Sequence, residues 1–267
     1  MPASSSLRDR VPGQIAMSAV VDCQLTTLPR TRLGRLFGKS PLTSQSRTLY
    51  RAAIGELLVG DMLDNLGPRW DVLHVVPLDD SGEDIDHLVI GPPGVFAIKT
   101  ENFPGQEIKV NGDFLAVGSQ RFDDIALARE LGQCAAGLLS AAAGRPVSVT
   151  PLLVVVTPTK LAIRQQPEGV AVVPSRQLLH YLDRLDRSLD GAEVAYISDV
   201  ADRHSTWRAD PGPAEDPHEL SQEFATLRTS VQEATQARIL WGIIAFAVVA
   251  AAVWISTATI VQHLIGR

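Results

Sequence analysis

Cysteine is scarce in this sequence, and its scarcity excludes two classes of small domain. The two cysteines, Cys23 and Cys134, stand far apart and belong to no spaced cluster. A disulfide framework needs several cysteines that can pair, and a zinc site needs closely spaced cysteine or histidine ligands. We therefore predict two ordinary reduced thiols, with neither a disulfide framework nor a structural zinc site.

One long stretch lacks charge altogether. Residues 239–260, ILWGIIAFAVVAAAVWISTATI, contain no charged residue, and Trp241 and Trp254 lie near the two ends. As a helix, these residues span about 33 Å, enough for a bilayer core of about 30 Å. Tryptophan at both ends is typical of the membrane interface. The pattern predicts one transmembrane helix over residues 239–262 and a short tail over 263–267.

The N-terminal region lacks an uninterrupted apolar run of signal-peptide length, so we expect no secretory signal. Arg228 and Arg238 precede the apolar stretch and only Arg267 follows it, a slight positive excess on the N-terminal side. Positive residues favour the cytoplasmic side of a membrane. We expect a single-pass membrane protein, anchored by its tail, with the main domain in the cytoplasm.

Charge is unevenly distributed along the chain. Residues 1–51 hold eight Lys and Arg against two Asp, a net charge of +6, which leaves −12 for the rest of a chain whose total is −6. Residues 1–46 are rich in Ser, Thr, Pro, Gly and Arg, which indicates a mostly flexible basic arm. Such an arm could contact nucleic-acid phosphates or anionic lipid heads, or be a solvated tail. For nucleic acid, the candidate residues are Arg30, Arg32, Arg35 and Lys39.

Residues 47–208 alternate between helical and strand-like patterns. A helical face over 47–66 precedes two strand-like runs, and Asn111-Gly112 predicts a tight hairpin turn between apolar runs. The all-apolar run at 152–156 is typical of a strand that is buried on both faces. This order of elements predicts an α/β domain with a sheet flanked by helices.

Residues 209–238 read as a linker followed by a juxtamembrane helix. Leu220, Phe224, Leu227 and Val231 repeat at helical spacing. This stripe is compatible with a self-associating stalk, which would make an oligomer, and equally with a connector that lies on the main domain.

The strand-like run GVFAIKTEN, residues 94–102, ends in charged residues that suggest chemistry. In a strand, Lys99 and Glu101 project from the same face. The run DIDHLVI ends at the tight turn GPPG just before, so an antiparallel partner strand would bring Asp86 alongside. Two carboxylates can hold Mg²⁺ through oxygen ligands, and a nearby lysine can orient water or offset developing charge. Alternating charges on an ordinary surface strand are the simpler explanation.

The segments GELLVGDMLDNL and DIDHLVIGPPGVFAIKTEN together resemble the nuclease-related domain, NERD, a branch of the PD-(D/E)xK nuclease superfamily. The resemblance covers roughly residues 47–208. It implies a restriction-endonuclease-like mixed sheet flanked by helices. Gly55-Glu56 match the family's Gly-Glu and Asp86 matches its metal-binding Asp, so Glu56 and Asp86 become candidate catalytic residues.

The chain departs from the family at the next motif. The family's acid position holds Lys99 and its lysine position holds Glu101, so the two charges survive in exchanged order. One interpretation is a working site in which Asp86 and Glu101 bind Mg²⁺, with Lys99 beside them and Glu56 as a further carboxylate. The other is a decayed site kept for its fold. The corresponding functions are Mg²⁺-dependent phosphodiester cleavage or nucleic-acid binding, and a catalytically inactive interaction module.

Overall fold

The computed structural model describes residues 6–78, 83–207 and 216–265, and these divide into two units. The first unit comprises residues 1–20 and 48–221, and the second comprises 21–47 and 222–267, apart from the undescribed positions. Most of the expected linker lies outside the described residues.

A five-stranded mixed sheet forms the centre of the first unit. Its order is β1-β2-β3-β7-β9, with β1–β3 antiparallel and β3, β7 and β9 parallel. The turn between β2 and β3 pairs Gly91 with Gly94, which confirms the tight connection that the sequence indicates. The strands are β1 (Asp71–Leu78), β2 (Glu83–Gly91), β3 (Gly94–Asn102), β7 (Val149–Val156) and β9 (Ala171–Pro174).

A smaller sheet of order β6-β5-β4-β8 follows the end of β3. The expected hairpin is present, because β4 and β5 pair around Gly112, whose φ of 61° suits a tight turn. β8 pairs in parallel with β4. The strands are β4 (Glu107–Asn111), β5 (Phe114–Val117), β6 (Gln120–Phe122) and β8 (Lys160–Gln165).

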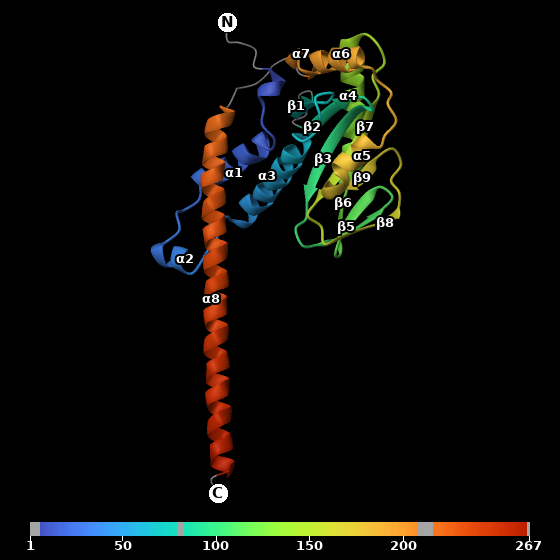
Figure 1. Ribbon diagram of the computed structural model, residues 1–267. Coiled ribbons are helices and arrows are strands. Elements are labelled where there is room, and N and C mark those ends of the chain that lie inside the picture. Colours follow the sequence, from blue (N-terminus) through green and yellow to red (C-terminus); the bar gives the residue numbers. More distant parts are fainter. Residues whose placement is uncertain (1–5, 79–82, 208–215, 266–267) are drawn as a thin grey trace. The chain divides into compact units, whose positions relative to one another are not determined.

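Helices cover both faces of the five-stranded sheet (Figure 1). On one face, Leu131, Leu139 and neighbours of α4 (Asp124–Ala143) pack with α6 (Gly191–Ala201) and α7 (His204–Trp207). On the other, α3 (Ser44–Leu63), with Val59, packs beside α5 (Leu178–Asp183). A short 3-10 helix, Ser175–Gln177, precedes α5. The predicted mixed α/β sheet flanked by helices is thereby confirmed.

The segment expected as a mostly flexible arm differs from that expectation. It contains a 3-10 helix at Leu7–Asp9, α1 (Gln14–Leu25) and α2 (Arg32–Leu36). Leu7, Met17 and Val20 are at most 1% exposed, so burial of these apolar side chains orders a segment whose composition suggests a solvated chain.

A single long helix, α8 (Pro217–Ile265), contains the charge-free stretch. It is long and apolar enough to cross a membrane, and the apolar window is not buried within the described chain. Among the four residues of the juxtamembrane stripe, Leu220 and Phe224 are buried and Leu227 and Val231 are half-buried.

Candidate functional site

Helix α3 carries Glu56 to the sheet because Gly55 lets the helix approach β3 closely. A Cβ atom at Gly55 would lie 2.8 Å from the Cβ of Asn102, inside van der Waals contact. Asn102 Nδ2 in turn donates to the carbonyl of Arg51, 2.8 Å away, which fixes the crossing point. The Gly-Glu pair therefore has a clear local role: the glycine makes the approach possible and places the next residue over the strands.

Asp86 lies where the pairing of β1 and β2 is interrupted. His74 pairs with His87 and Val76 with Ile85, so Val75 and Asp86 are skipped between them. Val75 has a φ of 53°, a strained value for a β-branched residue, costing on the order of 1–3 kcal/mol. Its carbonyl accepts a hydrogen bond of 2.5 Å from Arg10 Nη1. The two strands keep the same register on both sides of this gap, so neither strand carries an inserted residue.

The structure brings three of the four predicted catalytic residues into direct contact. Lys99 Nζ lies 3.6 Å from Asp86 Oδ1 and 3.9 Å from Glu101 Oε1. Asp86 is 7% exposed, and its Oδ2 accepts a hydrogen bond of 2.5 Å from the backbone N–H of Thr100. The lysine therefore bridges two carboxylates, and one of these is also held by the strand backbone.

Asp124, the first residue of α4, is a further acid of this site that was not predicted as a site residue. The N-cap residue of α4 is Asp123, which makes no side-chain capping hydrogen bond. The Asp124 carboxyl interacts with that of Glu101. Burial and, next, the Asp124 charge raise the pKa of Glu101 to about 7.

The pKa values of the other acids of the site are also raised. Burial and the nearby Asp86 raise the pKa of Glu56 well above its usual range. Burial also raises the pKa of Asp86 and of Asp124, although Lys99 opposes the shift in both. The Asp86 charge raises the pKa of Lys99, which stays an ammonium. Four carboxyl groups thus share one cation, and burial favours the protonated form of each of them.

A cavity of about 230 Å³ opens beside these groups. Glu56, Asp86 and Lys99 line one part of it, and Ile15, Ala16 and Ala19 of α1 line another. One wall of the candidate site is therefore apolar and comes from the N-terminal segment.

The donor set can be tested against the Mg²⁺ ion that the resemblance implies. Mg²⁺ demands near-octahedral oxygen ligands at about 2.0–2.1 Å. Among the described residues, no group of three or more His, Cys, Asp and Glu side chains is arranged to hold a metal ion. The two predicted ligands, Asp86 and Glu101, each have the Lys99 ammonium within 4 Å. As arranged, these residues do not fit Mg²⁺, because the lysine supplies the positive charge that the ion would bring.

His87, on the opposite face of β2 from Asp86, forms a pair with His74. The two Nδ1 atoms are 2.8 Å apart and the rings meet edge to face. Burial lowers the pKa of His87 well below its usual value and lowers that of His74 as well. The pair is therefore neutral and packs in the core beside the site.

Arg129 and Glu130 lie farther along α4. Arg129 forms an ion pair with Asp113 at 2.5 Å and donates to the carbonyl of Glu168, and Glu130 is exposed. The four basic residues of the expected nucleic-acid contact, Arg30, Arg32, Arg35 and Lys39, belong to the second unit.

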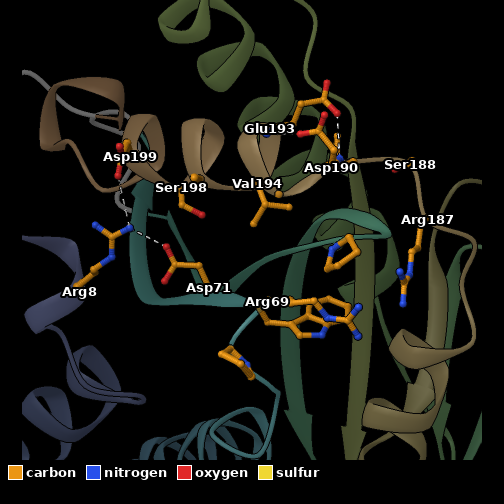
Figure 2. Close-up of a pocket in the computed structure, with 16 residues that line it drawn as sticks. Arg8, Arg69, Asp71, Arg187, Ser188, Asp190, Glu193, Val194, Ser198 and Asp199 are labelled. Atoms are coloured by element: carbon orange, nitrogen blue, oxygen red, sulfur yellow. Dashed lines mark hydrogen bonds and ion pairs between the residues drawn. The ribbon is translucent and has the colours of Figure 1, made fainter.

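A larger hollow, of about 970 Å³, lies near the turn that joins β2 and β3 (Figure 2). Ser198 and Val194 project into it from α6, and Arg8 reaches Asp71 at 2.7 Å on its wall. None of the four predicted catalytic residues lines it. It is a separate feature of the first unit and adds no group to the candidate site.

The comparisons with known proteins agree with the resemblance. Residues 51–156 match the family model of the nuclease-related domain, NERD, and the matched segment contains Glu56, Asp86, Lys99 and Glu101. No curated protein and no solved structure matches the chain.

Proposed function

We propose that the nuclease-related domain of this chain is a membrane-anchored nucleic-acid-binding module that does not cleave. The observation that carries the proposal is the contact of Lys99 Nζ with both predicted metal ligands, Asp86 and Glu101, within 4 Å. The match to a nuclease-related family supports nucleic acid as the ligand class. In this proposal the exchanged motif keeps the fold together through a buried ion-pair network.

The position of Lys99 on β3 explains why cleavage is disfavoured. Moving a lysine by two strand residues displaces it by about 7 Å, while catalysis depends on positions to about 1 Å. The acid that the family places at this position is replaced by a cation. A metal ion held between Asp86 and Glu101 would meet the Lys99 ammonium at close range and be repelled.

Mg²⁺-dependent phosphodiester cleavage is the second candidate, and the surplus of acids favours it. Glu56, Asp86, Glu101 and Asp124 surround a single lysine. Burial is the largest cause of their raised pKa values, and a neighbouring carboxylate adds to the shift for Glu56, Glu101 and Asp124. In that reading Asp86 and Glu101 hold Mg²⁺, Glu56 adds a carboxylate, and the Lys99 side chain withdraws from between them.

Calorimetric titration with Mn²⁺ separates the two candidates. If Lys99 stands in for the ion, the wild-type protein should bind no Mn²⁺, and Lys99→Met should create or strengthen binding. Lys109→Met, on the exposed side of β4, is the matched control and should behave as wild type. The same proteins are tested for binding labelled DNA and RNA in EDTA, where a non-cleaving module keeps its affinity. Wild-type Mn²⁺ binding together with metal-dependent cleavage would establish the second candidate and overturn the first.

Helix α8 supports a membrane anchor. We place residues 239–262 across the bilayer, with the domain on the cytoplasmic side, because Arg228 and Arg238 precede the apolar stretch. For the juxtamembrane stripe, a self-associating stalk has little apolar surface left to use. Leu220 and Phe224 are buried within the chain, so only Leu227 and Val231 are partly accessible to a second copy.

A further inference from the structure

Residues 30–39 form a closed loop, here called the basic loop, within the second unit. Thr31 Oγ1 accepts a hydrogen bond from Gly34 N at 3.0 Å and so caps the short helix α2. Lys39 N donates to the carbonyl of Gly34 at 2.7 Å, and Arg30 Nη1 donates to the carbonyl of Lys39 at 3.1 Å. These bonds tie the two ends of the loop together, so its side chains are presented from a fixed backbone.

The basic loop is fastened to α8 by three neighbouring contacts. Trp241 Nε1 donates to the carbonyl of Leu36 at 2.8 Å, and the Trp241 and Phe37 rings are 5.0 Å apart between centroids. Gly38, with a φ of 70°, lies so close to α8 that a Cβ there would be 2.5 Å from the Ala234 carbonyl oxygen and 2.6 Å from Arg238 N. Only glycine fits this contact without displacing the helix backbone.

The point of attachment coincides with the start of the charge-free stretch. Trp241 is the third residue of that stretch, and Ala234 precedes its first residue by five positions, about 8 Å along the helix axis. Tryptophan at such a position marks the boundary between water and lipid. If α8 enters a bilayer at residue 239, the basic loop lies at the level of the headgroups.

The side chains of the basic loop are of the kinds that bind at the level of the lipid headgroups. Leu33, Leu36 and Phe37 are 67%, 55% and 54% exposed, which is unusual for three large apolar residues so close in sequence. Arg32, Arg35 and Lys39 are exposed, and no ion pair is formed by them within the described part of the chain. No acidic residue occurs between Asp22 and Glu56. Apolar and basic side chains therefore stand together on one small, preformed surface.

We propose that the basic loop binds the surface of an anionic bilayer. Arg30, Arg32, Arg35 and Lys39 contact headgroup phosphates, while Leu33, Leu36 and Phe37 enter the interfacial layer below them. Basic residues near an anionic leaflet and apolar side chains at the acyl boundary are the two attractions that hold peripheral segments on membranes. The inference rests on the proposed anchor, because α8 brings the loop to the bilayer.

Nucleic acid is the other polyanion that these four cations could contact, and the apolar side chains weigh against it. Contacts with a phosphate backbone are made by basic and polar groups, and aliphatic side chains such as Leu33 and Leu36 add nothing to them. A lipid surface uses both sets of side chains, and the attachment at Trp241 places them where that surface begins.

Hydrogen exchange of the full chain in lipid nanodiscs tests the proposal. One set of discs contains zwitterionic phosphatidylcholine, and the other contains about a third phosphatidylglycerol. Amides of residues 30–39 should exchange several-fold more slowly in the anionic discs, since each basic residue near such a surface strengthens binding by roughly fivefold. Raising the salt concentration should reduce the difference. The variant R30Q/R32Q/R35Q/K39Q should abolish it.

A matched variant controls for net charge. R164Q/R176Q/R184Q/R203Q removes the same charge from exposed arginines of the first unit and should keep the full lipid-dependent difference. Equal exchange in both discs for a correctly inserted wild-type chain would overturn the loop proposal and leave the anchor intact. A chain that fails to enter the discs would overturn the anchor, and the loop proposal with it.

Two further measurements test the attachment of the loop to α8 and its choice between lipid and DNA. Gly38→Ala should detach the loop from α8 and speed its exchange in both kinds of disc, because the added Cβ collides with the helix backbone. The four-residue Gln variant is also tested for binding to DNA. Loss of DNA affinity with no lipid-dependent difference in wild type would assign the loop to nucleic acid and overturn the lipid proposal.

Discussion

Asp86 and Lys99 form a buried ion pair across two neighbouring antiparallel strands, with 3.6 Å between Oδ1 and Nζ. By the resemblance to the nuclease-related domain, these two positions correspond to two acids of the family pattern. Lys99 also interacts with three further carboxyl groups, those of Glu101, Glu56 and Asp124. The lysine is therefore the cation that balances negative charge at this end of the sheet.

The first prediction concerns the stability of this pair. Asp86→Ala leaves the Lys99 ammonium without its nearest carboxylate in a largely buried position, and should lower the free energy of unfolding by roughly 3–5 kcal/mol. The double variant Asp86→Asn with Lys99→Met removes both charges and should recover part of that loss. Urea denaturation measures both values. Equal stabilities for the single and double variants would argue against coupling between the two residues.

The second prediction restores the family order. Lys99→Glu with Glu101→Lys returns an acid to position 99 and moves the cation along the strand. If the site is decayed, this exchange should create Mn²⁺ binding and Mg²⁺-dependent cleavage of DNA, measured by calorimetry and by gel. In a site adapted to its exchanged order, the same change should lower any cleavage present in wild type. Failure of both proteins to bind metal or cut any DNA or RNA would remove the nuclease interpretation.

The third prediction concerns pH. The pKa of Glu101 is about 7 in the folded protein against a usual 4.5, so the folded state holds the extra proton between these values. The free energy of unfolding should therefore fall as the pH rises from 4.5 to 7. Glu101→Gln should escape this loss and exceed wild type above pH 7 by on the order of 1–2 kcal/mol, after allowance for partial exposure.

A control for that measurement is Glu130→Gln, which changes an exposed carboxyl group on α4. Its stability should follow wild type at every pH. His74 and His87 have lowered pKa values, which gives the opposite slope: they stabilise above about pH 6.5 and that contribution is lost as the pH falls. Their effect is common to all the variants, so it cancels when the free energy of unfolding of a variant is compared with that of wild type.

The fourth prediction concerns the anchor. A chain that ends at Arg238 loses the charge-free stretch and should appear in the soluble fraction with the thermal transition of the domain unchanged. The full chain should stay with membranes after washing with alkaline carbonate, because burial of about 20 apolar residues outweighs surface charge attraction. Release of the full chain by carbonate or high salt would contradict the transmembrane assignment.

Much of the fold could be predicted because it is encoded locally. The Asn111-Gly112 hairpin and the tight turn between β2 and β3 follow from glycine at positions that need it. The apolar run ending at Val156 is buried as a continuous run should be, and it pairs in parallel with β3. Period-two alternation and the turn together also predict that Asp86, Lys99 and Glu101 meet.

The parts that could not be predicted depend on contacts distant in sequence. Asp124 looks like a helix cap, and only the packing of α4 against β3 turns it toward Glu101. The N-terminal segment has the composition of a flexible arm, yet Met17 and Val20 are buried in the fold. The sequence pattern of β1 does not predict the left-handed conformation of Val75, which is skipped in the pairing with β2 and whose carbonyl accepts a hydrogen bond from Arg10.

The hydrogen bond between His74 and His87 determines which ring nitrogen of each histidine carries the proton. A hydrogen bond between two Nδ1 atoms needs one donor and one acceptor, so His74 and His87 must be different tautomers. The buried His87 Nε2 has no partner among the described residues, and a buried N–H without an acceptor is costly. The favoured arrangement has His87 protonated at Nδ1 and His74 at Nε2. Nitrogen-15 spectra of the imidazole rings should then show two neutral histidines with opposite assignments of the protonated nitrogen, joined by a coupling across the bond.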